Sequence, residues 1–397
     1  MEIQVRQQAA DLINRLNQAG FSAYLVGGCV RDLLLGSEPH DYDLTTNARP
    51  EAIKQVFSDL TTIDTGIKHG TVTVVYDKQN YEITTFRSDG EYQDHRHPDS
   101  VKYSDNLYDD VIRRDFTINA LAWHPDEGLI DHVGGLNDLQ NNRLRAIGDP
   151  EKRFNEDSLR ILRAIRFSAA YGFSIDPDTA RAMIKLKKNL KYVSVERIFS
   201  EFTRILTSQW AGEVFWLYRD IIGEFLPEIY DLSSRQYLQK CHCLDNSPKK
   251  LTLRLAVMLE NRSDTDAVLK RLKADHSTLK RVTLLCQHAN DIIMSDDYSL
   301  KKLLNVLGSD ALMELLELQQ ADGLIDRNYH KLLTDNITDI INRHEAYRIS
   351  DLAVNGNDMK ELGYQGAQIG EVLERLLDMV MAGRVKNQKN ALLQIAR

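Results

Sequence analysis

The chain has 397 residues, of which 43% are hydrophobic and 27% charged, with a formal net charge of −8. This is the composition of a folded globular protein, and the length predicts two to four domains. We find neither an apolar run of the roughly 18 residues that a membrane helix needs nor a charged-then-apolar leader, so we expect a cytoplasmic protein. Four scattered cysteines exclude a disulfide framework, and Cys241-His242-Cys243 lacks zinc-ligand spacing.

The charge is unevenly distributed along the chain. Residues 1–150 hold 14 Lys and Arg against 24 Asp and Glu, a net charge of −10, whereas residues 151–397 hold 36 against 34. An acidic first part with a locally basic remainder suits a long RNA that is bound away from the first part. The alternative is that the basic clusters are ordinary solvated helix faces.

The first 150 residues mix helical and strand patterns. Residues 2–19 predict an amphipathic helix that ends at Gly20, and short β-branched and aromatic runs predict strands at 23–28, 71–77, 81–86 and 129–133. From residue 151 onward, apolar residues recur at helical spacing with few Gly or Pro. We therefore predict an α+β fold: a mixed sheet with helices up to residue 150, followed by an all-α remainder.

A diglycine turn, Gly27-Gly28, lies between the first predicted strand and the start of a helix. Two glycines let a phosphate approach the backbone, and the free N–H groups of the helix N-terminus attract an anion. Arg31, in the first turn of that helix, can add a charge-assisted hydrogen bond. The alternative is a plain tight turn.

Two aspartates follow in Asp41-Tyr42-Asp43-Leu44. In a strand, residues i and i+2 point the same way, so Asp41 and Asp43 would aim two carboxylates at one place. Two like charges this close are costly unless a cation lies between them, and hard oxygen ligands favour Mg²⁺. The alternative is a solvent-facing loop, although Leu44-Thr45-Thr46 continues the strand.

A third carboxylate, Glu82, lies in the predicted strand Tyr81-Glu82-Ile83-Thr84-Thr85. It could complete a metal site or act as the base for an attacking hydroxyl. A structural glutamate is the alternative.

The diglycine, the Asp-x-Asp pair and the strand glutamate together resemble the polymerase-β-like nucleotidyltransferase superfamily. Arg113-Arg114-Asp115-Phe116-Thr117-Ile118-Asn119-Ala120 and the block from Arg153 to Phe167 resemble the bacterial class II CCA-adding enzymes and bacterial poly(A) polymerases. The resemblance runs from about residue 20 to 205 and resumes at Val354-Asn355-Gly356-Asn357-Asp358. It implies a polymerase-β-like head (1–150), then a helical neck (151–210), body (211–325) and tRNA-binding tail (326–397).

The resemblance also implies roles for individual residues. Asp41 and Asp43 would bind Mg²⁺ for two-metal phosphoryl transfer. Gly28 and Arg31 would contact the triphosphate, and Arg114 and Asp115 the incoming nucleotide. The remaining residues implied to line the nucleotide pocket are Asp157, Arg160, Arg163 and Arg166.

Asp157 and Arg160 also support an argument from the residues themselves. If both lie on one helix, positions i and i+3 place an acceptor beside a donor. Cytosine and adenine show an amino donor beside a ring-nitrogen acceptor, whereas uracil and guanine show the reverse order. The pair would thus accept C and A and reject U and G. The alternative is an ordinary surface ion pair.

Three members of the family need to be distinguished. Poly(A) polymerases usually carry an extra basic stretch after the glycine-rich loop, whereas here Gly66-Ile67-Lys68-His69-Gly70 leads straight into Thr71. CC-adding enzymes lack part of a loop that looks complete here, from Gly90 to Val101. We therefore expect an enzyme that adds C, C and A to tRNA from CTP and ATP, without an obligate protein partner. A non-catalytic RNA-binding relative would be expected to have lost a metal carboxylate.

Overall fold

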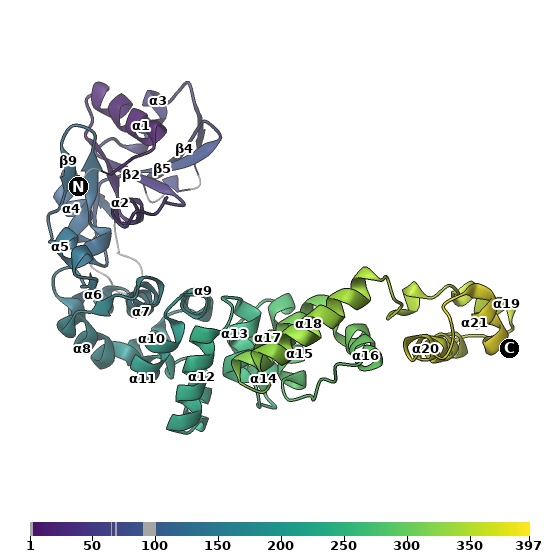
Figure 1. The fold of residues 1–397 in the computed structure, drawn as a ribbon. Helices are drawn as coiled ribbons and strands as arrows, with labels where there is room; N and C mark the ends of the chain where they lie inside the picture. Colours follow the sequence, from purple (N-terminus) through teal and green to yellow (C-terminus); the bar gives the residue numbers. More distant parts are fainter. Residues whose placement is uncertain (1–2, 65, 68–69, 90–100) are drawn as a thin grey trace. The chain divides into compact units, whose positions relative to one another are not determined.

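The computed structural model describes residues 3–64, 66–67, 70–89 and 101–397 (Figure 1). It divides the chain into two compact units, Met1–Asp231 and Leu232–Arg397, which are described separately below. The polar loop from Gly90 to Val101 lies almost wholly outside the described residues, as do two residues of the glycine-rich loop 66–70.

A mixed seven-stranded sheet organises the first part of unit 1. Its strand order is β3-β4-β5-β2-β1-β8-β9. β2 pairs parallel with β5 and antiparallel with β1, so the predicted mixed sheet is confirmed. The strands are β1 (Ala23–Val26), β2 (Tyr42–Thr46), β3 (Thr61–Ile63), β4 (Thr71–Tyr76), β5 (Gln79–Thr85), β8 (Ala122–His124) and β9 (Gly128–Ile130), and β6 (Arg87–Asp89) and β7 (Val101–Tyr103) form a separate hairpin.

Short helices cover this sheet. Helix α1 (Gln7–Gln18) packs on β1 and β2 through Leu12, Ile13 and Leu16, and it is shorter than the predicted 2–19 because residues 3–6 are not helical. Helix α3 lies beside β4 and β5 (Figure 1). The helices of this part are α2 (Gly28–Leu34), α3 (Pro50–Val56), α4 (Leu107–Ile112), the 3₁₀ turn η2 (Thr117–Asn119) and α5 (Gly135–Gln140).

The helical part of unit 1 begins at Pro150, close to the predicted change at residue 151. One small parallel pair crosses that boundary, because β10 (Arg143–Leu144) pairs with β11 (Ser174–Ile175). The helices here are α6 (Pro150–Glu156), α7 (Leu159–Tyr171), α8 (Pro177–Leu186), η3 (Lys187–Tyr192), α9 (Val195–Leu206), α10 (Ala211–Leu217), α11 (Arg219–Ile222) and η4 (Pro227–Asp231).

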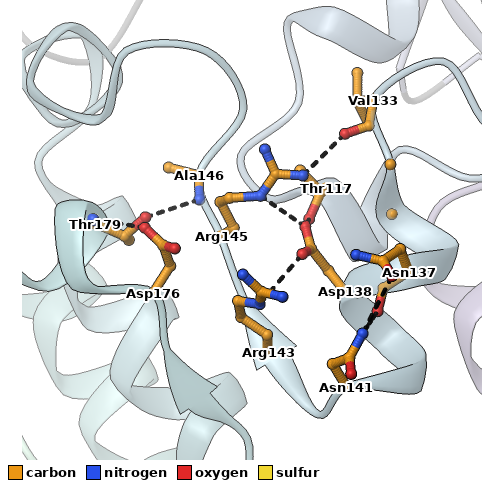
Figure 2. A network of polar contacts seen from close by, with 12 residues as sticks. Thr117, Val133, Asn137, Asp138, Asn141, Arg143, Arg145, Ala146, Asp176 and Thr179 are labelled. Carbon is orange, nitrogen blue, oxygen red and sulfur yellow. Dashed lines mark hydrogen bonds and ion pairs between the residues drawn. The ribbon is translucent and has the colours of Figure 1, made fainter.

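A polar network joins the sheet part to these helices (Figure 2). The buried carboxylate of Asp138 accepts hydrogen bonds from the Thr117 hydroxyl at 2.7 Å and from Arg145 Nε at 2.8 Å. Nearby, the Ala146 amide donates to the hydroxyl of Thr179 on α8 at 3.1 Å. Since Thr117 lies in the Arg113–Ala120 block, this network connects the block to helix α8.

Unit 2 is all-helical. Residues 346–396 contain an apolar core, built around Met359, Leu376 and Leu392, which are fully buried. The described residues contain no helix that is both long and apolar enough to cross a membrane. The helices are α12 (Ser234–Asn246), α13 (Leu251–Leu259), α14 (Thr265–Arg271), α15 (His276–His288), α16 (Asp297–Leu307), α17 (Ser309–Ala321), α18 (Arg327–Asn342), η5 (Ile349–Asp351), α19 (Gly356–Glu361), α20 (Ala367–Met381) and α21 (Lys389–Ala396).

Candidate active site

A cavity of about 480 Å³ lies in unit 1, between α2, the Arg113–Ala120 block and α7. All the residues predicted to bind nucleotide line it, together with Asp43. Five further lining residues were not predicted as contacts. The predicted ones are Gly28, Arg31, Arg114, Asp115, Asp157, Arg160, Arg163 and Arg166, and the additional ones are Arg113, Asn119, Leu159, Phe167 and Arg197.

The diglycine turn shapes one wall of this cavity. Gly27 has φ +81°, in the left-handed region that favours glycine, and a Cβ on it would lie 2.6 Å from Arg114 Nη1. Gly28 lines the cavity itself. Gly27 is therefore required for the backbone turn and for the close approach of an arginine, a reason that the sequence pattern did not reveal.

Arg31 is nearly buried, and its guanidinium is held along its edges. Its Nη1 donates to Asn119 Oδ1 at 2.5 Å, while Nε and Nη2 donate to Asp32 Oδ1 at 2.9 and 2.8 Å. The guanidinium also lies 5.2 Å from the centre of the Phe167 ring, a cation–π distance. Arg31 thus enters the cavity with a fixed orientation.

Asp110 on α4 holds the two arginines of the Arg113–Ala120 block. Its Oδ1 accepts from Arg113 Nε at 3.0 Å and Nη2 at 2.7 Å, and its Oδ2 accepts from Arg114 Nη2 at 3.2 Å. Burial raises the pKa of Asp110, but the charges of Arg114 and Arg113 together hold that pKa below its ordinary value. Asp110 therefore stays ionised and anchors both side chains.

Asp115 contacts Arg163 from inside the protein wall. Its Oδ2 accepts from Arg163 Nε at 2.7 Å, and its Oδ1 accepts from Asn119 Nδ2 at 3.1 Å. Burial opposes ionisation, but Arg163 and these hydrogen bonds bring the pKa of Asp115 down to about 2. In this state Asp115 orients Arg163, whose guanidinium faces the cavity.

The prediction that Asp157 and Arg160 share a helix face is wrong. Asp157 has an extended conformation, with φ −145° and ψ 104°, at the C-terminal cap of α6, and α7 begins at Leu159. The chain breaks there because the Asp157 side chain accepts the Leu159 amide at 3.1 Å, a local bond that competes with a continuous helix. Both side chains nevertheless line the same cavity.

Asp157 and Arg160 each have an ionic partner that the sequence analysis did not name. Asp157 accepts two hydrogen bonds from Arg197 on α9, at 3.3 and 2.8 Å, and Arg160 donates to Glu156 at 2.7 Å. The bidentate geometry makes the Asp157–Arg197 pair a strong, well-oriented one. Sequence reasoning missed Arg197 because it lies 40 residues away on another helix.

Every arginine that lines the cavity has a carboxylate within ion-pair distance. Seven arginines share six carboxylates, and Arg166 Nε lies 2.8 Å from Glu201. The arginines are therefore held in place before any ligand arrives. The pairs are Arg31–Asp32, Arg113–Asp110, Arg114–Asp110, Arg160–Glu156, Arg163–Asp115, Arg166–Glu201 and Arg197–Asp157.

The predicted catalytic carboxylates lie at one face of the β2–β5 pair. Asp43 and Glu82 are direct partners in the parallel register, whereas Asp41 precedes β2 instead of belonging to it, and its side chain is 81% exposed. Burial raises the pKa of Asp43, and the charges of Glu82 and Asp41 raise it further against the opposing effect of Arg114. Only Asp43 of the three lines the cavity.

These carboxylates are suitable ligands for a divalent cation whose remaining ligands come from a substrate and from water. Among the residues that the structure describes, no three His, Cys, Asp or Glu side chains are gathered as metal ligands. A magnesium ion needs only one or two carboxylates when substrate phosphates and water complete its shell. A partly buried carboxylate whose pKa is raised by negative neighbours is stabilised by such a cation. The donor set therefore suits a hard cation at Asp43 and Asp41.

Comparison with family models covers three stretches of the chain. Residues 23–145 match "Poly A polymerase head domain", residues 172–229 match "Probable RNA and SrmB-binding site of polymerase A", and residues 244–396 match "tRNA nucleotidyltransferase domain 2". The sheet part and both helical parts are thus each similar to a segment of nucleotide-adding enzymes.

Individual proteins are similar over nearly the whole chain. The CCA-adding enzyme of Lactobacillus johnsonii is 35% identical over 395 residues, 97% of this chain and 95% of that protein. The CCA-adding enzyme of Lactococcus lactis is 36% identical over 393 residues, with the same coverage. The solved structure of the Bacillus stearothermophilus CCA-adding enzyme in complex with CTP is 29% identical, with a TM-score of 0.84 over 98% of this chain and 96% of that one. This chain belongs to the family of the CCA-adding enzymes.

Proposed function

We propose that this protein adds C, C and A in turn to the 3′ end of tRNA, using CTP and ATP and releasing pyrophosphate, in the cytoplasm. One observation carries the proposal: a single cavity joins the carboxylate of Asp43 to seven oriented arginines and to Asp157. Such a cavity suits a nucleoside triphosphate, because it combines a carboxylate that can hold a metal ion, arginines that can bind phosphates and an acceptor that can read the base. CTP in the related Bacillus stearothermophilus structure supports a nucleotide of this kind.

The arginines would hold the triphosphate. Gly28 and Arg31 lie on α2 beside Arg114, and the three groups line one part of the cavity. Guanidinium groups bind phosphate oxygens through pairs of N–H donors. Asp115 would act through Arg163, since its carboxylate oxygens accept bonds inside the wall. Arg166, paired with Glu201, lines the same cavity.

The base would be selected by protein side chains. Asp157 would accept a hydrogen bond from the amino group of cytosine or adenine, and Arg160 would donate to the neighbouring ring nitrogen. Uracil and guanine present the reverse order and leave both groups unmatched. Asp157 must exchange at least part of its bidentate contact with Arg197 for the base. Each such matched pair is worth about 1–3 kcal/mol in analogous base readout.

The nucleotide would be transferred beside Asp43, within the cavity. Enzymes of this family generally use divalent metals, and we propose Mg²⁺, held by Asp41 and Asp43. When bound, Mg²⁺ stabilises the charge that develops on the phosphates and the leaving pyrophosphate. Glu82, the register partner of Asp43 in the sheet, would orient the 3′-hydroxyl or accept its proton. The hydroxyl oxygen attacks the α-phosphorus and the bond to pyrophosphate breaks.

The test is a sequencing experiment. We would incubate the protein with a tRNA transcript that ends at the discriminator base, with CTP and ATP together and each alone, and sequence the 3′ ends. We expect CCA with both nucleotides and CC with CTP alone. Asp43→Asn, which removes the charge and keeps the shape, is the matched control and should leave the transcript unextended. A poly(A) product, or products that stop at CC with both nucleotides present, would contradict the proposal.

A further inference from the structure

Tyr171, at the end of helix α7, contacts helix α2, which supplies Gly28 and Arg31 to the lining of the cavity. Its hydroxyl donates to Asp32 Oδ1 at 3.0 Å, although 139 positions separate the two residues in the sequence. Asp32 lies on α2, next to Arg31. The contact therefore links the helix that follows the diglycine turn to the helix that carries Arg160, Arg163 and Arg166.

The same oxygen of Asp32 orients Arg31. It accepts from Arg31 Nε at 2.9 Å and from Nη2 at 2.8 Å, in addition to the Tyr171 hydroxyl. The Tyr171 ring lies under the guanidinium as well, with its centre 4.9 Å from the central carbon of Arg31. Tyr171 thus acts on Arg31 twice, through the ring and through the Asp32 carboxylate.

The ring belongs to a small aromatic platform. Phe167, one turn earlier on α7, lies 6.3 Å from Tyr171 with an angle of 17° between the rings, and it also supports the Arg31 guanidinium. Burial and the Asp32 charge raise the pKa of Tyr171 to about 12, although the charge of Arg31 opposes them. The phenol is therefore protonated at any physiological pH and remains a hydrogen-bond donor.

We propose that Tyr171 is a positioning residue, which acts through Asp32 to fix Arg31 for the triphosphate. The inference rests on the proposed contact of Arg31 with the phosphates. Helix α7 would then have two roles, because it carries Arg160, which is proposed to contact the base, and also positions Arg31 on α2. The distance between this base contact and the phosphate contacts would be fixed by this one helix.

The test removes the hydroxyl and keeps the ring. For Tyr171→Phe we expect KM for CTP and for ATP to rise by the same factor, about 3- to 10-fold, the usual cost of losing one intramolecular hydrogen bond. We expect kcat to stay within about twofold, because the reacting groups are untouched. Inorganic tripolyphosphate should inhibit the variant less by a similar factor, whereas inhibition by cytidine, which has no phosphate, should be unchanged.

Matched variants separate this role from a general effect on the fold. Tyr218→Phe removes the hydroxyl of another half-buried tyrosine in unit 1 and should leave both inhibition constants unchanged. Asp32→Asn should weaken tripolyphosphate inhibition as Tyr171→Phe does, and the double variant should be no worse than Asp32→Asn alone. Additive losses would show that Tyr171 does not act through Asp32 and would overturn the inference.

Arg31→Gln distinguishes failure of this inference from failure of the proposed function. If Arg31→Gln loses tripolyphosphate inhibition while Tyr171→Phe retains wild-type KM and inhibition, then Arg31 binds phosphate and Tyr171 does not position it. If Arg31→Gln itself keeps wild-type inhibition, then the proposed phosphate contact of Arg31 is wrong and the inference falls with it. A KM change in Tyr171→Phe for only one of the two nucleotides would also overturn the inference, since the phosphates are common to both.

Discussion

In the proposed selection of the base, the carboxylate of Asp157 exchanges one hydrogen-bond partner for another. In the structure it accepts a bidentate pair of hydrogen bonds from Arg197. A cytosine or adenine amino group offers one N–H donor in exchange. Discrimination therefore depends on the difference between two hydrogen-bonded states, which is smaller than the full strength of either.

The first prediction concerns this exchange. Asp157→Ala and Arg160→Ala should each lower kcat/KM for CTP and ATP by about 5- to 150-fold, the equivalent of a bidentate base contact. The bases of UTP and GTP leave both side chains unmatched, so their use should fall less. The measurement is kcat/KM for all four nucleotides on one tRNA ending in the first C. A uniform loss for all four would mean that the two residues only hold the helices in place.

The second prediction concerns the pH dependence at Asp43. Because burial and the neighbouring carboxylates raise its pKa, the proton competes with a cation at a higher pH than for an ordinary aspartate. Activity should therefore fall on acidification, and the acidic limb of the kcat/KM profile should move to lower pH as the Mg²⁺ concentration rises. Asp43→Asn should be inactive at every pH and metal concentration. If the pH of the acidic limb did not change with the Mg²⁺ concentration, Asp43 would be excluded as a metal ligand.

Among the secondary-structure elements, α7 and the Asp138 network determine the shape of the cavity. Helix α7 supplies Arg160, Arg163 and Arg166, at successive turns of one face. Asp138 holds Thr117 and Arg145, and thereby the back of the Arg113–Ala120 block (Figure 2). The site thus depends on contacts that no nucleotide touches.

The third prediction removes this support. Asp138→Ala leaves the Thr117 hydroxyl and Arg145 without their shared acceptor, and we expect a loss of about 1–3 kcal/mol in the free energy of unfolding, since Arg145 is partly exposed and can be solvated. KM for both nucleotides should rise together. Urea unfolding and steady-state kinetics measure the two effects. Asp126→Ala, in an exposed turn of the same unit, is the control and should change neither.

Local patterns predicted the elements well, but not the contacts between them. The strands around Asp43 and Glu82 were predictable because their apolar residues alternate, and the Arg113–Ala120 block was identifiable from its residues. The end of α6 at Glu156 was not, because a short polar bond to the next helix stops it. The partners of Asp157 and Tyr171 lie 40 and 139 positions away, and no periodicity along the chain encodes such distances.

At the scale of the whole molecule, the cavity lies in one compact unit, and the second unit contributes no residue to its lining. All the residues that line the cavity lie in Met1–Asp231. Leu232–Arg397 contains an apolar core of its own and none of the residues that line the cavity. We therefore expect the second unit to contribute to binding of the tRNA and little to binding of the nucleotide.

The fourth prediction separates the two units. A protein comprising residues 1–231 should fold and keep KM for CTP within a few-fold of the full chain. Its KM for tRNA should rise about tenfold or more, because the phosphate contacts of the second unit are lost, and its affinity for tRNA should depend less steeply on salt. Filter binding at several salt concentrations and steady-state kinetics measure these quantities. An unchanged KM for tRNA would mean that unit 1 alone recognises it.

Because every arginine that lines the cavity is paired with a carboxylate, the ion pairs influence which polyanion can bind there. Seven guanidinium groups without carboxylate partners would bind the sugar-phosphate backbone of any RNA, including internal segments of the tRNA. The six carboxylates neutralise most of that attraction. We expect that only a ligand with several phosphates at the right separations, together with a cation, can replace the carboxylates in concert. The charge balance of the cavity would then keep internal segments of the tRNA from competing with the nucleotide.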